Sequence, residues 1–327
     1  MNPNLVAIVS GGFSSEKEIS LRSAQQIKKM IEGDHYQPYI VLISPEEWSV
    51  VLGENEFVPI DKNDFSFEKE GQKIRFDVAL ITIHGHPGEN GIIQSYFELV
   101  GIPYSTGNVL SSALSANKFA SKTYLRNFNV LTANAVLVRK DQEYNPAKII
   151  RVVKLPCFVK PNDGGSSYGV TKVKEAKDLV PAIDKAFEES TEVIVEEFIA
   201  GTEITCGVIK TRDTEILLPL TEIVSKTEYF DTLAKYDPSL ADEITPARIP
   251  EAIAKECQEL SSQIYDAMNF RGLVRVDFIL KDKKLYFLEV NTTPGMSAES
   301  IVPKQLACHG MSLFEMYDLI LQDALNP

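Results

Sequence analysis

Residues 273–291 constrain the fold more than any other stretch, because they hold two runs rich in β-branched and aromatic residues around the polar residues 281–284. Such runs on either side of a short polar segment are typical of an antiparallel β-hairpin. Side chains alternate between the two faces of a strand. The hairpin therefore gathers several polar side chains on one face.

That face carries Arg275 and Asp277 on the first strand and Glu289 and Asn291 on the second. A loop of three or five residues would place Asp277 opposite Glu289 and Arg275 opposite Asn291. Opposed carboxylates repel unless a cation lies between them, and carboxylate and amide oxygens suit Mg²⁺. The alternative is a solvated face with scattered charges. The apolar residues that bound this face, and the turn at 292–295 with its backbone N–H groups, favour the metal site.

The chain has 327 residues, more than one core usually accommodates, so two or three domains are expected. The net charge of −13 argues against nucleic acid or an anionic membrane as the main partner, because both attract basic surfaces. Four widely spaced cysteines with no signal peptide ahead of them favour reduced thiols in a cytoplasmic protein. No apolar run approaches the ~20 residues of a membrane span.

Strands expected at residues 5–9, 39–43 and 76–83 alternate with helix in the first third of the chain. This alternation predicts an α/β domain with a doubly wound parallel sheet. A dinucleotide-binding domain is the obvious rival, but the G-x-G-x-x-G fingerprint is missing after the first strand. A dehydrogenase is therefore disfavoured.

Two residues of this domain are candidate ligand contacts. Glu16 lies in the first turn of the first helix, at the sheet edge where open α/β sheets bind ligands. Glu18 has capping-box spacing from Ser15 and is assigned to the helix cap, for which Glu16 is not needed. His84 ends a strand. Its position is equally consistent with a ligand contact and with a structural or capping role.

The rest of the chain predicts mixed α+β structure. A helix is expected over residues 109–128, with Lys118 and Lys122 four residues apart, and lysines on helices are usually solvated. Residues 229–248 are polar, irregular and too long for an ordinary connection, so we expect a mobile functional loop. A helix closes the sequence from about residue 311, and strands are expected at residues 133–138, 157–160, 170–173 and 193–197.

Residues 160–169 form a glycine- and serine-rich loop between two predicted strands. It differs from the phosphate loop G-x-x-x-x-G-K-[ST], which joins a strand to a helix. Its backbone N–H groups can still converge on an anion, and Lys160 adds a point charge. A flexible hairpin tip is the plain alternative. A metal site further along the chain favours a flap that closes over nucleotide phosphates.

Taken together, these features resemble the ATP-grasp enzymes, and more closely the D-alanine–D-alanine ligase family. The resemblance runs from about residue 5 to residue 321, and six motifs in order make it specific although each alone is weak. They comprise residues 11–21, 84–85 with 88–89, 160–161 with 165–167, 196–203 with 235–236, 275–277 and 289–295.

The family resemblance implies an α/β fold of the α+β ATP-grasp type. An N-terminal α/β domain with a doubly wound parallel sheet would span residues 1–106. A central ATP-grasp subdomain with the glycine flap would span 107–196, and a C-terminal catalytic subdomain with the metal site would span 197–327. The two subdomains would clamp ATP between them. ATP as co-substrate and two Mg²⁺ ions follow from the resemblance, with Mn²⁺ as an alternative ion.

The resemblance also implies residue roles. The metal ions would be held by Asp277, Glu289 and Asn291. Arg275 and the Gly295 backbone would stabilise the tetrahedral oxyanion, while Glu16, Ser166 and Tyr236 would form a network that orients the first amino acid. His84 would contact substrate, and Lys235, Ser300 and Ile301 would face the second substrate. ATP would be contacted by Lys118, Lys160, Glu196, Glu197, Ile199 and Glu203.

Three residues depart from the family pattern. Asn90 stands where aspartate is usual, and Glu197 where lysine is common beside the adenine. These two put little chemistry in doubt. Ile301 takes a position often filled by leucine near the acceptor site, and this change can alter acceptor preference.

The implied activity is the ATP-driven joining of two D-alanines through an acyl phosphate, for peptidoglycan precursor synthesis in the cytoplasm. Phosphoryl transfer needs mainly positioning and charge neutralisation, and an acyl phosphate must be shielded from water. The alternatives are a ligase that uses D-lactate, D-serine or another small amine as acceptor, and an inactive nucleotide-binding regulator. D-alanine and ATP are the expected partners, with no nucleic acid and no membrane; a homodimer is left open.

Overall fold

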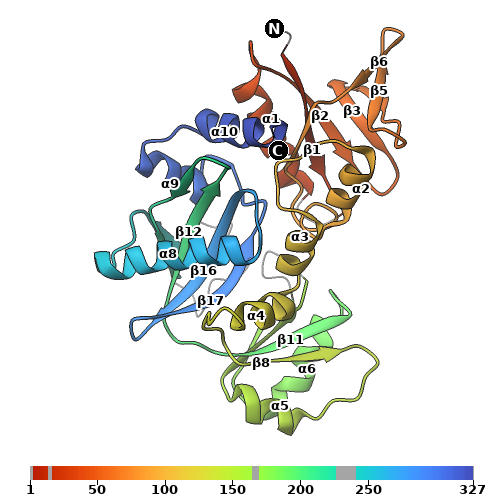
Figure 1. Ribbon diagram of the computed structural model, residues 1–327. Coiled ribbons are helices and arrows are strands. Elements are labelled where there is room, and N and C mark those ends of the chain that lie inside the picture. The colour runs from red at the N-terminus through yellow and green to blue at the C-terminus, as the bar shows by residue number, and fades with distance from the viewer. Residues whose placement is uncertain (1–2, 14–16, 164–168, 226–240, 327) are drawn as a thin grey trace.

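The computed structural model describes residues 3–13, 17–163, 169–225 and 241–326. Three sheets with their helices follow one another along the chain, and Figure 1 shows the first at the top, the second at the bottom and the third between them. No helix in the described ranges is long and apolar enough to cross a membrane.

The first sheet has a parallel centre. Strand β1 pairs in parallel with β2 on one side and β7 on the other, which confirms the predicted parallel sheet. Two further strands, β3 and β4, extend it with antiparallel pairing, which the strand–helix alternation did not predict. The strand order is β4-β3-β2-β1-β7, with bounds β1 (Asn4–Gly11), β2 (Tyr36–Ile43), β3 (Trp48–Gly53), β4 (Glu56–Pro59) and β7 (Val78–Ile81).

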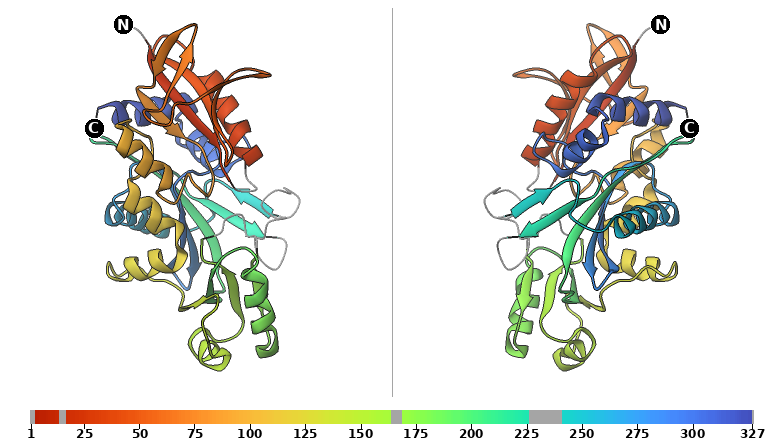
Figure 2. Two further views of the ribbon diagram at one scale, coloured as in Figure 1. Left: turned by 90° about the vertical axis from the view of Figure 1, so that its right-hand side faces the viewer. Right: turned by 90° about the vertical axis from the view of Figure 1, so that its left-hand side faces the viewer.

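Both faces of this sheet are covered, as expected of a doubly wound domain. Val6 and Ile8 pack against α1 (Lys17–Ile31) and α10 (Leu313–Leu325). Ala7 and Val9 belong to the opposite core, with Phe97 of α2 (Ile92–Val100). Figure 2 shows α10, the last helix, lying beside α1. A separate hairpin, β5 (Ser66–Lys69) with β6 (Gln72–Arg75), adds Phe67 to this opposite core.

The predicted helix over 109–128 is two helices, α3 (Val109–Ala116) and α4 (Lys118–Arg126). Asn117 between them is extended, with φ −99° and ψ 102°, and its side chain accepts a hydrogen bond from Ala120 N. An asparagine at this point caps the second helix, so the backbone turns instead of continuing. The break sets Lys118 at the start of α4, where its backbone N–H donates to Asn162 O.

The second sheet is antiparallel, with the order β10-β9-β11-β8. Its apolar face packs against α5 (Pro146–Val153) and α6 (Leu179–Ala186), which follows the short 3₁₀ helix η1 (Ala176–Asp178). All four strands match the predicted ranges to within two residues, with bounds β8 (Ala135–Arg139), β9 (Cys157–Pro161), β10 (Thr171–Val173) and β11 (Glu192–Glu197).

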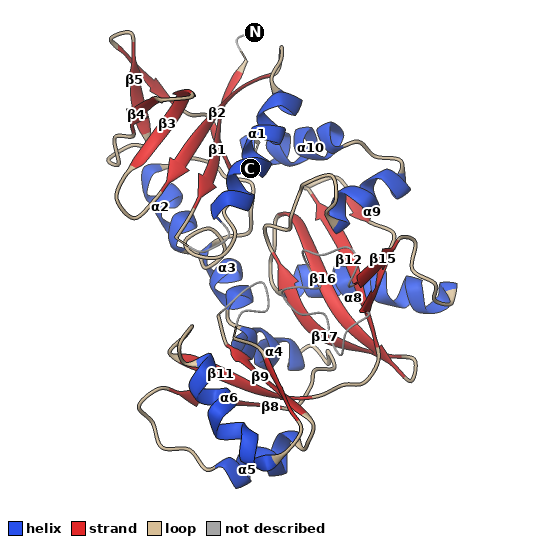
Figure 3. Cartoon of the chain, turned by 180° about the vertical axis from the view of Figure 1, so that it is seen from behind, coloured by secondary structure: helices blue, strands red, loops and turns tan. Residues whose placement is uncertain are grey.

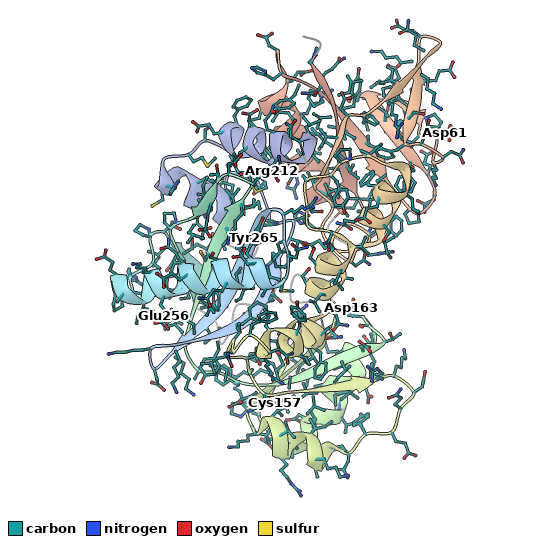
Figure 4. The ribbon with its side chains drawn as sticks, in the orientation of Figure 1. Asp61, Cys157, Asp163, Arg212, Glu256 and Tyr265 are labelled. Atoms are coloured by element: carbon teal, nitrogen blue, oxygen red, sulfur yellow. The ribbon has the colours of Figure 1, made fainter. Side chains whose placement is uncertain are left out.

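The third sheet is built around β12, β16 and β17, in the order β15-β14-β12-β16-β17 with β13 beside β12. Helix α8 (Glu251–Ala267) covers its apolar face, where Tyr265 donates to the backbone of Gly272, and Figures 3 and 4 show this packing. Helix α9 (Ile301–His309) comes after β17 in the chain. The strands are β12 (Thr202–Lys210), β13 (Glu215–Leu217), β14 (Thr221–Ser225), β15 (Ala241–Ile244), β16 (Gly272–Lys281) and β17 (Lys284–Asn291).

The segment predicted to be a loop at 229–248 contains a strand, since β15 pairs with β14. Residues 226–240, which hold most of that segment, lie outside the described ranges, as do 164–168 of the glycine loop.

Candidate functional site

The hairpin of β16 and β17 carries the centre of the site. Asp277 lies opposite Glu289 and Arg275 opposite Asn291, which confirms the predicted pairing. The loop length differs from the prediction: the turn has only two residues, Asp282 and Lys283, both with positive φ. Such turns suit the twist of a hairpin.

A β-bulge restores the pairing that the shorter turn would otherwise lose. The register shifts between Asp277 and Phe278, where Phe278 pairs with Phe287 and Asp277 with Glu289, so Leu288 is the extra residue. Phe287 faces the core at 1% exposure, and Glu289 two residues later faces the polar side. The bulge therefore interrupts the alternation of β17, so that Phe287 points to the core while Glu289, two residues later, points to the opposite, polar face.

Asp277 is held by four hydrogen bonds. Arg275 donates through Nε to Oδ1 at 2.9 Å and through Nη2 to Oδ2 at 2.8 Å. Asn291 Nδ2 donates to Oδ2 at 2.9 Å, and Thr205 Oγ1 donates to Oδ1 at 2.5 Å. Asp277 is only 3% exposed, so these bonds replace water around its carboxylate. Asp277 also raises the pKa of Arg275 against the lowering effect of burial.

A buried group of three charges lies on the neighbouring elements. Glu196 of β11 is 2.6 Å from Lys160 Nζ through Oε2 and 3.0 Å from Lys122 Nζ through Oε1. Lys160 belongs to β9 and Lys122 to α4, where it is 1% exposed. Its Nζ also donates to Phe287 O at 3.3 Å. The usual expectation that a helical lysine is solvated is thus wrong for Lys122.

Burial and opposite charge compete in this group. Burial works to raise the pKa of Glu196, but Lys122 and Lys160 together lower it to about 2. Burial lowers the pKa of Lys122, partly offset by Glu196. For Lys160 the balance is reversed: Glu196 and Glu289 raise its pKa in spite of burial. Glu196 is therefore ionised throughout the neutral range.

Lys122 was missed as a candidate by sequence reasoning. Its spacing of four residues from Lys118 was a usable signal, because it places both side chains on one face of a helix. Lys118 contacts the hairpin, since its Nζ lies 3.8 Å from Glu289 Oε2. The start of α4 is also bound to the end of β9, because Phe119 N donates to Asn162 Oδ1 at 2.9 Å.

The turn after β17 is fixed to the N-terminal sheet by Glu89. Its Oε1 accepts from Thr293 N at 3.1 Å, and its Oε2 accepts from Gly85 N at 2.8 Å. The Thr293 hydroxyl donates to Ile83 O at 3.0 Å. His84 lies between these contacts and lines a cavity of about 50 Å³ together with the turn. Glu89 belongs to one of the motifs found in the sequence, but the motif alone did not predict that Glu89 would connect the turn after β17 to the N-terminal sheet.

Gly295 and Ser300 are close to each other at the start of α9. A Cβ on Gly295 would lie 2.9 Å from Ser300 Oγ, so a larger residue there would have to displace the Ser300 hydroxyl. Ser300 Oγ is 2.8 Å from Ser297 Oγ, and Ile301 follows as the first residue of the helix.

The other predicted residues lie near the end of β11 and the start of β12. Glu197 accepts from Asn134 Nδ2 at 2.7 Å, and Ile199 lies in the connection to β12. Glu203 of β12 pairs in register with Ile279. Asn90, at the first family departure, is 2.9 Å from His86 Nδ1.

Four predicted residues, Glu16, Ser166, Lys235 and Tyr236, lie outside the described residues. The predicted meeting of Glu16, Ser166 and Tyr236 therefore stays a prediction.

The donor set fits a magnesium ion that is bound with phosphate. Asp277 and Glu289 supply two carboxylates from facing strands and Asn291 an amide. Across the described ranges there is no group of three or more His, Cys, Asp or Glu side chains that could hold a metal. Mg²⁺ usually takes one or two carboxylates and completes its shell with waters and substrate phosphates. Asp277, Glu289 and Asn291 match this mode of coordination.

Comparisons with known proteins cover nearly the whole chain. The family model described as D-ala D-ala ligase N-terminus matches residues 5–107, and the one described as D-ala D-ala ligase C-terminus matches residues 125–322. The chain is 50% identical over 319 residues to the D-alanine–D-alanine ligase of Phocaeicola vulgatus, a match that covers 97% of this chain and 98% of that one.

Two solved structures are similar throughout. The VanG D-Ala:D-Ser ligase from Enterococcus faecalis has a TM-score of 0.87 and 31% identity, covering 98% of this chain and 99% of that one. The Bacillus anthracis D-alanine–D-alanine ligase complexed with ATP has a TM-score of 0.79 and 27% identity, covering 99% and 98%.

Proposed function

Because this chain belongs to the D-alanine–D-alanine ligase family, we propose that it joins two D-alanines into D-alanyl-D-alanine while ATP is converted to ADP and phosphate. The product would serve peptidoglycan precursor synthesis. The observation that carries the proposal is the face of the third sheet on which Arg275, Asp277 and Glu289 lie together. Lys118 of α4 lies beside this face, with its Nζ 3.8 Å from Glu289 Oε2, and Lys122 of the same helix pairs with Glu196 of the second sheet.

In the proposed nucleotide site, Lys118 and Lys160 contact the phosphates, and the segment from Glu196 through Glu197 to Ile199 receives the adenine. Glu203 binds the ribose. The position of these residues at the ends of β9, β11 and β12 supports the assignment. We add Lys122 to this site as the group that keeps Glu196 ionised and in place.

In the proposed metal site, Asp277, Glu289 and Asn291 hold two Mg²⁺ ions, with Mn²⁺ as an alternative. When bound, the ions neutralise charge on the transferring phosphoryl group. Lys118 beside Glu289 adds positive charge at the same place.

The reaction proceeds in two steps. The carboxylate of the first D-alanine attacks the γ-phosphorus of ATP, which releases ADP and leaves an acyl phosphate. The amine of the second D-alanine, having lost a proton, then attacks the acyl carbon, and phosphate departs. Arg275 and the backbone N–H of Gly295 face the negative charge that builds on the carbonyl oxygen.

The substrates are oriented by side chains from several elements. Glu16, Ser166 and Tyr236 bind the first D-alanine with His84 nearby. Lys235, Ser300 and Ile301 face the carboxylate of the second. The position of Ser300 immediately before α9 supports the assignment of the second carboxylate, because the N-terminus of a helix attracts an anion.

D-serine is the strongest alternative acceptor, because a structurally similar relative is a D-Ala:D-Ser ligase. ADP release measured with D-alanine, L-alanine, D-serine and D-lactate, together with analysis of the product, tests the function. We expect D-alanine alone to support the highest rate and to yield the dipeptide. Equal rates with L-alanine, or ADP release without any dipeptide, would contradict the proposal.

We further propose that the protein works in the cytoplasm as a homodimer. Four free cysteines and an ATP-dependent reaction support the compartment. Exposed apolar side chains at Ile92 and Leu99 on α2 and at Leu110 on α3 support the dimer. Light scattering of the wild type and of Leu99→Glu tests it: the wild type should have twice the mass of the chain, and the variant should shift towards the monomer.

A further inference from the structure

The Asp277 carboxylate has no room for a further donor in this structure. Its two oxygens offer about four lone-pair positions, and four donor groups occupy them. Arg275 and Asn291 supply three of these, and both have other tasks in the proposed reaction. Thr205 supplies the fourth. It is therefore the donor that can stay in place while the others serve substrate and metal.

Thr205 is built to hold one position. It is fully buried, it lies opposite Asp277 in the pairing of β12 with β16, and its hydroxyl is 2.5 Å from Oδ1. A β-branched side chain in a strand has few rotamers. The direction of the hydroxyl thus depends mainly on the backbone of β12.

Among the described residues, no strand pairs with the other edge of β12 between Thr205 and Val208, although Leu218 N donates to Gly207 O at 2.9 Å. Strand β14 pairs with β12 as far as Thr205, and β13 takes over only at Val208. The side chain of Gln305 fills the gap: its Oε1 accepts from Gly207 N at 3.1 Å, and its Nε2 donates to Thr205 O at 3.0 Å. One side-chain amide therefore makes the two bonds that a neighbouring strand would make.

The approach of Gln305 depends on glycine at position 207. A Cβ on Gly207 would lie 2.8 Å from Gln305 Oε1 and 2.6 Å from a Leu218 methyl group. Gln305 itself is fully buried on α9, the helix whose first residue is Ile301. A continuous set of contacts thus runs from the helix proposed to bind the acceptor to the carboxylate proposed to bind metal.

We propose that Thr205 is a positioning residue for Asp277, and that Gln305 sets the position of Thr205 from helix α9. The proposal rests on the function proposed above for Asp277. Groups that orient a metal ligand through hydrogen bonds typically affect metal affinity or activity by about 10- to 100-fold when removed.

The first test compares Thr205→Val, which keeps the shape and removes the hydroxyl, with Thr205→Ser, which keeps the hydroxyl. Thr221→Val is the matched control: Thr221 is equally buried, lies opposite Thr205 on β14, and bonds to the Thr245 hydroxyl at 2.6 Å. We expect Thr205→Val to lower kcat about 10- to 100-fold with little change in the KM for ATP. Thr205→Ser should recover most of the loss, and Thr221→Val should retain wild-type kcat.

The second test does not depend on turnover. Mn²⁺ binding to the full-length protein is followed by electron paramagnetic resonance in the presence of a non-hydrolysable ATP analogue. Thr205→Val should weaken Mn²⁺ binding about 10-fold or more, and Thr205→Ser and Thr221→Val should not. Wild-type Mn²⁺ binding and kcat in Thr205→Val would overturn the proposal, and so would equal losses in Thr221→Val.

Gln305→Met removes both amide bonds at similar side-chain length. If Gln305 acts through Thr205, the double variant should lose little more than Thr205→Val alone, whereas independent effects would multiply. Multiplicative losses in kcat and Mn²⁺ affinity would contradict the link. A wild-type protein that releases no ADP with any amino acid would refute the proposed function, while the Mn²⁺ measurements would still decide the role of Thr205.

Discussion

At the residue scale, Glu289 joins the two charged parts of the proposed site. It lies opposite Asp277 on the hairpin, and its Oε2 is 3.8 Å from Lys118 Nζ. Its side chain is partly exposed, at 26%, so a change there leaves the core intact. A residue with these contacts can be replaced to test chemistry separately from folding.

We expect Glu289→Gln to lower kcat by at least about 100-fold, because the amide keeps the shape but removes the charge that a metal needs. The melting temperature should stay within a few degrees of wild type. Steady-state ADP release and thermal unfolding measure the two effects. Near-normal Mg²⁺-dependent turnover would exclude Glu289 as a metal ligand.

Lys122→Met tests the buried charge group. Removal of one partner from a buried pair is strongly destabilising, and we expect about 3 kcal/mol here, the low end of the usual range, because Lys160 remains beside Glu196. The KM for ATP should rise as well. Urea unfolding and ATP titration give both values.

The control for this variant is Lys177→Met, since Lys177 forms an ion pair of 2.7 Å with Glu175 at the surface. Exposed pairs contribute about 0–1 kcal/mol, so this variant should unfold like the wild type. Equal losses in the two variants would mean that the burial of Lys122 has no energetic consequence.

The charge of Glu196 predicts a pH dependence of stability. Its pKa falls from 4.5 to about 2 on folding, so the unfolded chain binds the proton more readily. The stabilisation is complete above 4.5 and is lost as pH falls through about 2. The difference in unfolding free energy between wild type and Glu196→Gln should therefore be constant near neutrality and shrink within that window. A difference that does not change there would contradict the assigned charge state.

At the scale of single elements, the β16–β17 hairpin shows what sequence could and could not predict. The alternation of residues predicted the strands and the pairing of Asp277 with Glu289. It could not predict the bulge at Leu288, because alternation assumes a regular strand, and a two-residue turn with an extra residue gives the same pairing as a longer loop. The break before Lys118 was missed for a similar reason: a cap competes with a continuing apolar pattern.

Deletion of Leu288 tests whether the bulge matters beyond pairing. The deletion keeps Phe287 opposite Phe278 and Glu289 opposite Asp277, so the sheet should form and the melting temperature should change little. The local twist that directs Glu289 would be lost, and a displacement of about 1 Å can cost roughly 100-fold in rate. We expect folded protein with kcat lowered at least about 10-fold. Wild-type kcat would show that pairing alone suffices.

At the scale of the whole molecule, buried charge was the least predictable feature. The sequence indicates which residues are charged, but only the packing of α4 against β17 shows that Lys122 is enclosed. The domain limits 1–106, 107–196 and 197–327 stay a prediction. These limits assign α10 to the C-terminal subdomain, yet α10 packs in the core of the first sheet, which belongs to the N-terminal domain.

Tyr36→Phe tests that connection. The Tyr36 hydroxyl donates to Asp318 Oδ1 at 2.7 Å and accepts from Gln322 Nε2 at 2.8 Å, both on α10. We expect about 1–2 kcal/mol of destabilisation and faster hydrogen exchange in α10. Tyr96→Phe is the control, since the Tyr96 hydroxyl bonds to Lys62 O within the N-terminal part. Exchange in α10 that is equal in the two variants would contradict the role of Tyr36.

The placement of α10 also has a consequence for how the chain is made. Synthesis runs from the N-terminus, so Val6 and Ile8 leave the ribosome long before Met316 and Leu321, which cover them. Until then the part of this side of the first sheet that α1 does not cover exposes apolar surface, and such surface promotes aggregation. A nascent chain of this protein therefore passes through most of its translation with an unfinished first domain, and slow elongation late in the message would prolong its need for a chaperone.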